Sequence, residues 1–110
     1  MGMIRCPVHG LTHITTCCIH IGEAVDANRF EHATVVVDHS GTAHVLCDRC
    51  LPQAEAQLRA GPSNVPGGNF LQLDPPLEPY CHKHLIEWYE ATGQGNLSEE
   101  IKRARARAKP

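Results

Sequence analysis

Cys47-Asp48-Arg49-Cys50 is the stretch of this sequence that most constrains the fold. Its two thiols are separated by two residues, a gap that lets one short turn aim both at a single metal ion. Three further pairs have the same gap, in Cys6-Pro7-Val8-His9, Cys17-Cys18-Ile19-His20 and Cys81-His82-Lys83-His84. Thiolate sulfur and imidazole nitrogen are the ligands that structural Zn²⁺ prefers. The sequence therefore predicts two zinc ions, each held by four side chains.

The predicted ligands divide in the same way whichever pairs are matched. They are Cys6, His9, Cys17, His20, Cys47, Cys50, Cys81 and His84. Only one pair is Cys/Cys, so any matching yields one Cys₃His set and one Cys₂His₂ set. Neither set leaves a coordination position for water, which is typical of structural zinc. One zinc ion or none remains an alternative, because Cys-x-x-His pairs also arise by chance in a chain with eight histidines.

Two adjacent cysteines compete for one ligand position in the second pair. Cys17 preserves the two-residue gap to His20 and is the predicted ligand, which leaves Cys18 as a small buried hydrophobe. The histidines outside the pattern are predicted to lie at the surface or to be hydrogen-bonded, although one of them could orient a ligand. They are His13, His32, His39, His44 and His82.

Secondary-structure signals surround the ligand pairs. A β-hairpin is predicted from β-branched and apolar residues at 33–37 and 42–46 around turn residues 38–41, and it runs directly into Cys47. Helical patterns follow three of the pairs, at 21–27, 51–60 and 85–92. In the last of these, Leu85, Trp88 and Tyr89 form an apolar face. Together these signals predict a small α+β domain stabilised by zinc.

The first pair adds a family resemblance. Cys6-Pro7-Val8-His9-Gly10 resembles the zinc knuckle of zinc-ribbon and treble-clef proteins, with His9 in place of the usual second cysteine. A knuckle, a hairpin and a helix whose first turn carries Cys47 and Cys50 resemble a treble-clef zinc finger, with residues 11–31 inserted. The resemblance implies that the first pair shares a zinc ion with the third, and the second pair with the fourth. Sequential pairing is the alternative.

This crossed order is similar to that of RING domains, but the spacing is not. Twenty-six residues separate His20 from Cys47, where RING domains have two or three. No ubiquitin-ligase activity is therefore implied.

Charge and composition divide the chain into a body and a tail. Residues 1–97 are predicted to form one zinc-binding domain that includes a Pro/Gly-rich loop at 61–79, and residues 98–110 a basic C-terminal tail. The first 101 residues carry all twelve acidic side chains and five basic ones, whereas residues 102–110 carry five basic and no acidic ones. The tail is predicted to be a solvated helix end with Ser98 as its N-cap. Phe70, Leu71 and Leu73 make the loop a candidate interaction segment.

These features favour a non-catalytic role. The patterns of zinc deaminases and His-Glu-x-x-His proteases are absent, and the helical and strand context of a thioredoxin-like dithiol is missing. Three disulfides are the alternative use of six cysteines, but the sequence contains no signal-peptide or membrane-length apolar run. We therefore expect a cytoplasmic zinc-binding protein that is not an enzyme and that binds another protein as adaptor, regulator or inhibitor. Nucleic-acid binding through the Arg-rich tail is the alternative.

Overall fold

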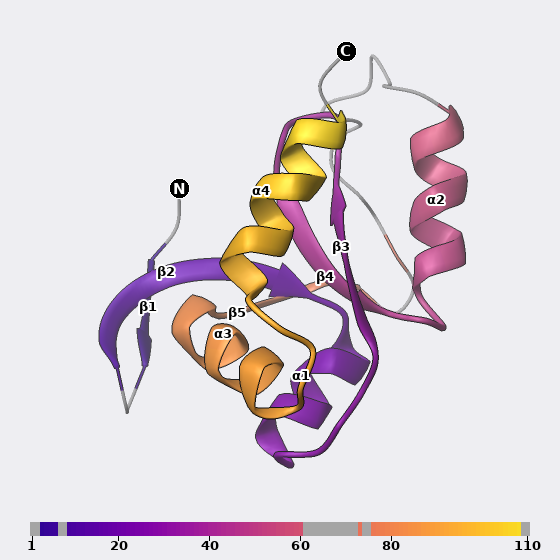
Figure 1. The fold of residues 1–110 in the computed structure, drawn as a ribbon. Coiled ribbons are helices and arrows are strands. Elements are labelled where there is room, and N and C mark those ends of the chain that lie inside the picture. Colours follow the sequence, from indigo (N-terminus) through magenta and orange to yellow (C-terminus); the bar gives the residue numbers. More distant parts are fainter. Residues whose placement is uncertain (1–2, 7–8, 61–72, 74–75, 109–110) are drawn as a thin grey trace.

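The computed structural model describes residues 3–6, 9–60, 73 and 76–108. Its elements follow the chain as β1 (Met3–Cys6), β2 (Gly10–Cys17), α1 (Ile19–Asp26), β3 (Ala33–Val37), β4 (Ala43–Cys47), α2 (Leu51–Ala60), β5 (Glu78–Cys81), α3 (His82–Ala91) and α4 (Leu97–Ala108). The described residues therefore form a small α+β fold with a mixed sheet and four helices (Figure 1).

Strand β2 is the centre of the sheet. Its first half pairs antiparallel with β1, and its second half lies between β5, which runs antiparallel to it, and β4, which runs parallel. Strand β3 pairs antiparallel with β4, so the predicted hairpin is present. In Figure 1, β2 curves above α3, α1 lies below the end of β2, and α4 passes in front of the sheet.

The position of β2 differs from the prediction. Residues 11–31 were predicted to be an insertion, but β2 is the central strand of the sheet. The segment Leu11-Thr12-His13-Ile14-Thr15-Thr16 contains four β-branched side chains, and these favour a strand. Thr12 and Thr15 are buried within the fold. Residues 10–26 are therefore the central strand and first helix of the domain.

The apolar core lies between the sheet and α1, α3 and α4. Leu85, Trp88 and Tyr89 of α3 are buried, as the helical pattern predicted. The Trp88 indole Nε1–H donates to the Arg29 carbonyl over 2.8 Å, which satisfies its polar atom inside the core. All six cysteines are buried, and Cys17, Cys18, Cys47 and Cys50 belong to the core.

Helix α1 passes close to β5, and Gly22 allows this approach. A Cβ atom at Gly22 would lie 3.3 Å from Glu78 Oε2 and 3.6 Å from the Tyr80 ring. Glycine weakens an isolated helix, but here it lets the helix backbone contact the neighbouring strand.

The C-terminal segment is part of the core. Leu97, Ile101 and Ala104 of α4 are buried together, one helical turn apart. The helix is capped by Asn96, whose Oδ1 accepts the Glu99 amide over 3.1 Å, so the prediction of Ser98 as N-cap was wrong.

The predicted loop at 61–79 is described only in part. Leu73 is buried, and Glu78 and Pro79 belong to β5. Phe70 and Leu71, the predicted interaction segment, lie outside the described residues.

Candidate metal centre

Two groups of cysteine and histidine side chains gather in the described part of the chain. One contains Cys6, His9, Cys81 and His84, and we call it the Cys₂His₂ cluster. The other contains Cys18, His20, Cys47 and Cys50, and we call it the Cys₃His cluster. In each cluster the candidate ligand atoms all lie within 4.8 Å of one another. The two compositions are those expected from the spacing.

The Cys₂His₂ cluster joins the two ends of the sequence. Cys6 ends β1 and His9 follows in the turn before β2, where Gly10 has a φ of 72°. Cys81 ends β5 and precedes α3, whose first turn carries His84. Ligands at the start of a helix lie near unpaired amides and the positive end of the dipole, which favours thiolate.

Two of the three sulfur–nitrogen separations found in this cluster equal that of a tetrahedral site, and the third is shorter. Cys6 Sγ lies 3.1 Å from His84 Nδ1 and 3.6 Å from His9 Nδ1, and Cys81 Sγ lies 3.6 Å from His9 Nδ1. With the usual Zn–S and Zn–N bond lengths, a tetrahedral Zn²⁺ separates a sulfur and a nitrogen ligand by about 3.6 Å. The imidazole rings of His9 and His84 meet edge to face, with centroids 4.6 Å apart. Both present Nδ1 to the sulfurs.

Glu87 contacts one of these candidate ligands. His9 Nε2 lies 2.8 Å from Glu87 Oε2, one turn after His84 on α3. Glu87 and Cys6 raise the pKa of His9. A carboxylate that accepts the second ring N–H of a ligating histidine fixes its tautomer and increases its basicity toward metal. The contact leaves Nδ1 free to face Cys6 and Cys81.

The Cys₃His cluster gathers two helix starts. Cys18 is the N-cap of α1, and His20 lies in its first turn. Cys47 ends β4, and Cys50 precedes α2. His20 Nδ1 lies 3.4 Å from both Cys47 Sγ and Cys50 Sγ, again close to the tetrahedral separation.

Burial changes the acidity of these thiols. It raises the pKa of Cys50 to about 12 and also raises that of Cys18. The Cys47 amide opposes the shift at Cys18 by donating to its Sγ over 3.3 Å. Such thiols stay neutral when free, whereas a bound cation deprotonates a coordinating thiol outright. The cluster is thus much better suited to holding a metal than to redox reactions as free thiolates.

The predicted pairing was wrong. The structure brings the first pair together with the fourth, and the second with the third. The reason is β2, which lies between β4 and β5 and so separates Cys47, at the end of β4, from Cys81, at the end of β5. The treble-clef resemblance assigned residues 11–31 to an insertion and could not include this strand.

The choice of Cys17 also differs from the structure, which places Cys18 in the cluster. Cys17 is fully buried at the end of β2, and burial raises its pKa to about 12. Cys18 keeps an extended backbone after the end of β2, with φ −73° and ψ 160°, so its side chain points away from that of Cys17. The two-residue gap was a misleading criterion because β2 ends at Cys17 and α1 begins only at Ile19, with Cys18 as its N-cap.

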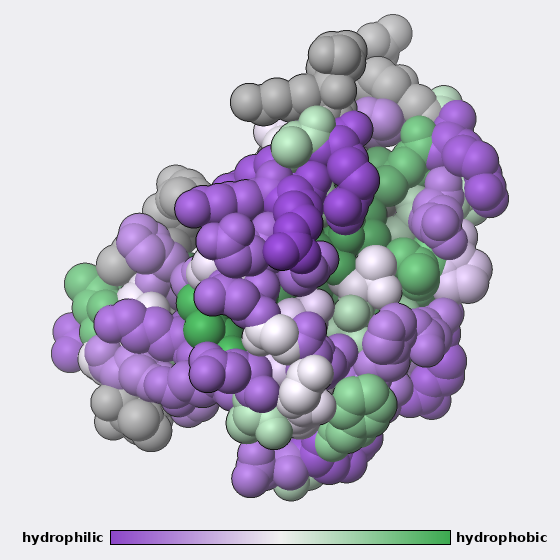
Figure 2. Space-filling view, in the orientation of Figure 1, coloured by the Kyte–Doolittle hydropathy of each residue, from purple (hydrophilic) through white to green (hydrophobic). Residues whose placement is uncertain are grey.

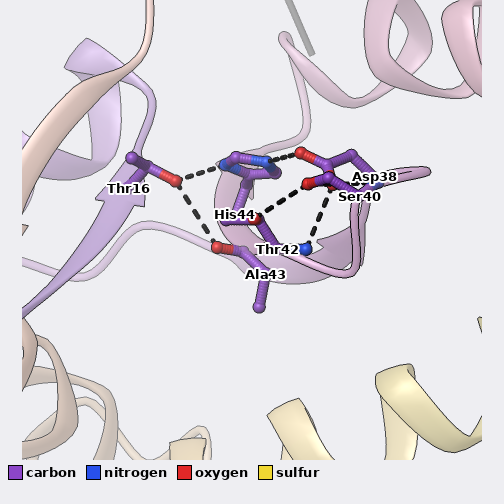
Figure 3. A network of polar contacts seen from close by, with 6 residues as sticks. All are labelled: Thr16, Asp38, Ser40, Thr42, Ala43 and His44. Carbon is purple, nitrogen blue, oxygen red and sulfur yellow. Dashed lines mark hydrogen bonds and ion pairs between the residues drawn. The ribbon is translucent and has the colours of Figure 1, made fainter. Parts of the chain in front are cut away.

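A buried polar network lies apart from both clusters (Figure 3). His44 Nε2 donates to Asp38 Oδ2 over 2.7 Å, and His44 Nδ1 contacts the Thr16 hydroxyl. Asp38 Oδ1 accepts the Ser40 and Thr42 amides. Burial alone would raise the pKa of Asp38, but these hydrogen bonds lower it below the usual value. The network attaches the β3–β4 turn to β2.

Sequence reasoning missed this network. Asp38 was assigned to turn chemistry and His44 to the histidines outside the metal pattern. The available signal was a histidine inside a strand whose neighbours are apolar, six residues after an aspartate. The other histidines also lie outside the clusters, as expected: His32 contacts Asp48 at 2.7 Å, and His82 contacts Thr15 at 2.6 Å.

A cavity of about 590 Å³ lies beside this network, between β2, the β3–β4 turn, the start of α3 and α4. Burial lowers the pKa of His82 on its wall, and the nearby His13 and Arg105 lower it further.

None of the helices that the structure describes has the length and apolar character needed to cross a membrane. No protein-family model, curated protein or solved structure matches this chain.

Proposed function

We propose that this chain binds two zinc ions as structural elements and acts as a non-catalytic module that binds another protein. The observation that carries the proposal is the pair of four-ligand clusters with tetrahedral separations. Cys18, His20, Cys47 and Cys50 would hold one ion, and Cys6, His9, Cys81 and His84 the other. Four protein ligands leave no position for a substrate or an activated water.

We also propose that the fold is related to treble-clef zinc fingers. A knuckle that ends in His9 and a helix start at Cys81 supply one ligand set, and this supports a treble-clef-like relationship. The relationship differs from the expected one, because the helix is α3 and not α2.

A protein partner is favoured over a nucleic acid by the charge of the body. Twelve acidic side chains against five basic ones in residues 1–101 oppose phosphate contacts over most of the surface. The same charge suits a basic protein surface. An adaptor, regulator or inhibitor acting in the cytoplasm fits these features.

Native mass spectrometry before and after a chelator tests the zinc proposal. We expect two zinc ions per chain, lost together with the helical circular dichroism signal, because metal-binding energy is folding energy in such domains. Cobalt substitution adds a readout of geometry: tetrahedral spectra for both sites support closed coordination. A five-coordinate or water-bound spectrum would contradict the non-catalytic role.

The partner class needs a separate experiment. Deleting the basic tail is unsuitable, because Ala104 of α4 is buried. Replacing the exposed Lys102, Arg103, Arg105 and Arg107 with glutamine keeps the helix and removes its charge. Salt-dependent DNA or RNA binding by the unmodified protein that this variant loses would favour the nucleic-acid alternative. Zinc-dependent binding to a purified partner protein, retained by the variant, would support the proposal.

A further inference from the structure

The cavity beside α4 has a cationic wall. Its charge comes from Lys102 and Arg105 of α4, and His13 of β2 and His82 at the start of α3 also line it. No carboxylate is among its lining residues. In the described part of the chain, neither Lys102 nor Arg105 forms an ion pair, whereas Arg103 on the same helix pairs with Glu100. Like charges that converge without a counter-charge are most stable when an anion lies between them.

Hydroxyl groups complete the polar part of the wall. Thr16, Ser40 and Ser98 reach it from β2, the β3–β4 turn and α4 respectively. The Thr16 hydroxyl is held by His44, which in turn contacts the buried carboxylate of Asp38 (Figure 3). Thr16 donates its hydroxyl proton to the Ala43 carbonyl, and Ser40 donates its own to Asp38. The strongest donors left for a ligand are therefore the charged side chains of α4.

The remaining wall is apolar. Ile14, Ala43 and Ile101 lie among the polar groups. A ligand that fills the cavity would therefore combine a charged end with a less polar body. About 590 Å³ lies within the range of small-molecule pockets, roughly 300–1,000 Å³.

We propose that this cavity, between β2, α4 and the β3–β4 turn, binds a small phosphate-bearing molecule of about nucleotide size. Its phosphate contacts Lys102 and Arg105, and its body packs against Ile14 and Ile101. Phosphate matches the donors, because guanidinium and ammonium groups bind its oxygens with charge-assisted hydrogen bonds. A nucleic-acid polymer fits less well, since the acidic body offers no continuous track for further phosphates.

Adenosine 5′-monophosphate is a suitable probe, with adenosine as the uncharged comparison and a short single-stranded oligonucleotide as the polymer. Isothermal titration calorimetry on the zinc-loaded protein should show binding of the nucleotide and little binding of adenosine. The Lys102→Gln/Arg105→Gln variant should weaken nucleotide binding by about tenfold or more, as expected when charged donors to a phosphate are removed. Arg103→Gln is the matched control on the same helix, and it should leave the affinity within about twofold.

Each substituted side chain is exposed, so zinc content and circular dichroism should match those of the parent protein. The proposal is overturned if the nucleotide does not bind at millimolar concentration, or if Arg103→Gln weakens binding as much as the cavity variant. It is also overturned if the oligonucleotide binds more tightly than the nucleotide and all basic substitutions reduce that binding equally.

Discussion

At the scale of single residues, two adjacent cysteines have opposite roles. Cys18 faces His20 and Cys47 in the Cys₃His cluster, and Cys17 is enclosed at the end of β2. The difference follows from strand geometry, because neighbouring side chains point to opposite faces. Serine substitutions at the two positions can therefore distinguish a cysteine that binds metal from one that is only buried.

We predict that Cys18→Ser removes one zinc ion and that Cys17→Ser keeps both. A hydroxyl in place of Cys17 should cost about 1–2 kcal/mol of unfolding free energy through polar burial. Loss of a zinc ligand should cost several times more, roughly in proportion to the metal-binding energy. Zinc stoichiometry by mass spectrometry and urea unfolding measure the two effects. If Cys17→Ser released a zinc ion and Cys18→Ser kept both, Cys17 would be the ligand.

Glu87 offers a second test, because it contacts a ligand without being one. Glu87→Gln should weaken zinc binding at the Cys₂His₂ cluster by about 10- to 100-fold, the usual effect of losing the carboxylate behind a ligating histidine. Competition with a chromophoric chelator measures this affinity. Glu90→Gln is the matched control, since Glu90 is exposed on the same helix. Equal affinities in the two variants would show that Glu87 does not support His9.

Asp38 should make stability depend on pH in the acidic range. Its folded-state pKa lies below the usual value, so its contribution is complete above the unfolded-state pKa of about 3.9. The contribution is lost as the pH falls through the folded-state pKa. We expect Asp38→Asn to cost about 2–3 kcal/mol near neutral pH, since it weakens a buried charge-assisted network.

Urea unfolding of both proteins between pH 3 and pH 7 measures this difference, roughly across the range in which an aspartate titrates. The gap between them should close as the pH falls below about 4. The comparison uses the pH values at which both proteins retain their helical circular dichroism signal, because acid also releases zinc. A gap that does not change with pH would contradict a role for the Asp38 charge.

At the scale of elements, the helices divide by how deeply they are buried. Helix α4 contributes Leu97, Ile101 and Ala104 to the core, while Ala54 is the only fully buried side chain of α2. Figure 2 shows hydrophilic atoms over both helices and hydrophobic atoms between them. The basic segment at the C-terminus therefore serves as a structural helix as well as a charged surface.

Two alanines on α4 test this division. Ala104→Glu places a carboxylate at a buried position and should destabilise the protein by about 3 kcal/mol or more. Ala106→Glu, at an exposed position two residues later, should change the unfolding free energy by less than about 0.5 kcal/mol. Thermal unfolding of the zinc-loaded proteins distinguishes them. Similar stabilities would mean that α4 does not pack in solution.

At the scale of the whole molecule, each cluster joins segments that are far apart in sequence. The Cys₂His₂ cluster connects Cys6 to His84, 78 residues later. The Cys₃His cluster connects the start of α1 to the start of α2. A metal ion bound at each cluster would crosslink these segments and stabilise the small domain by restricting its unfolded chain.

We predict that loss of each zinc ion loosens a different part of the fold. Cys81→Ser should increase amide exchange in β1 and α3, which the Cys₂His₂ cluster joins, and Cys50→Ser should do so in α1 and α2. Hydrogen–deuterium exchange with zinc stoichiometry measures both. If the two variants exchange identically, the clusters act as one unit and the separate roles are wrong.

The sequence by itself predicted the residue types and spacing of the ligands, the composition of both sets, the β3–β4 hairpin and the apolar face of α3. These features depend on local periodicity and on chemistry within a few residues, which a single chain displays directly. They were sufficient to indicate a small α+β domain with two clusters.

Only the tertiary structure decided which pairs meet, which of Cys17 and Cys18 faces a cluster, and where the basic helix lies. Each of these depends on β2, whose neighbours come from residues near 44 and near 80. Strand pairing over such separations is set by packing of the whole core, which local spacing does not report. For the same reason, the Asp38–His44–Thr16 network and the cavity beside α4 became visible only in three dimensions.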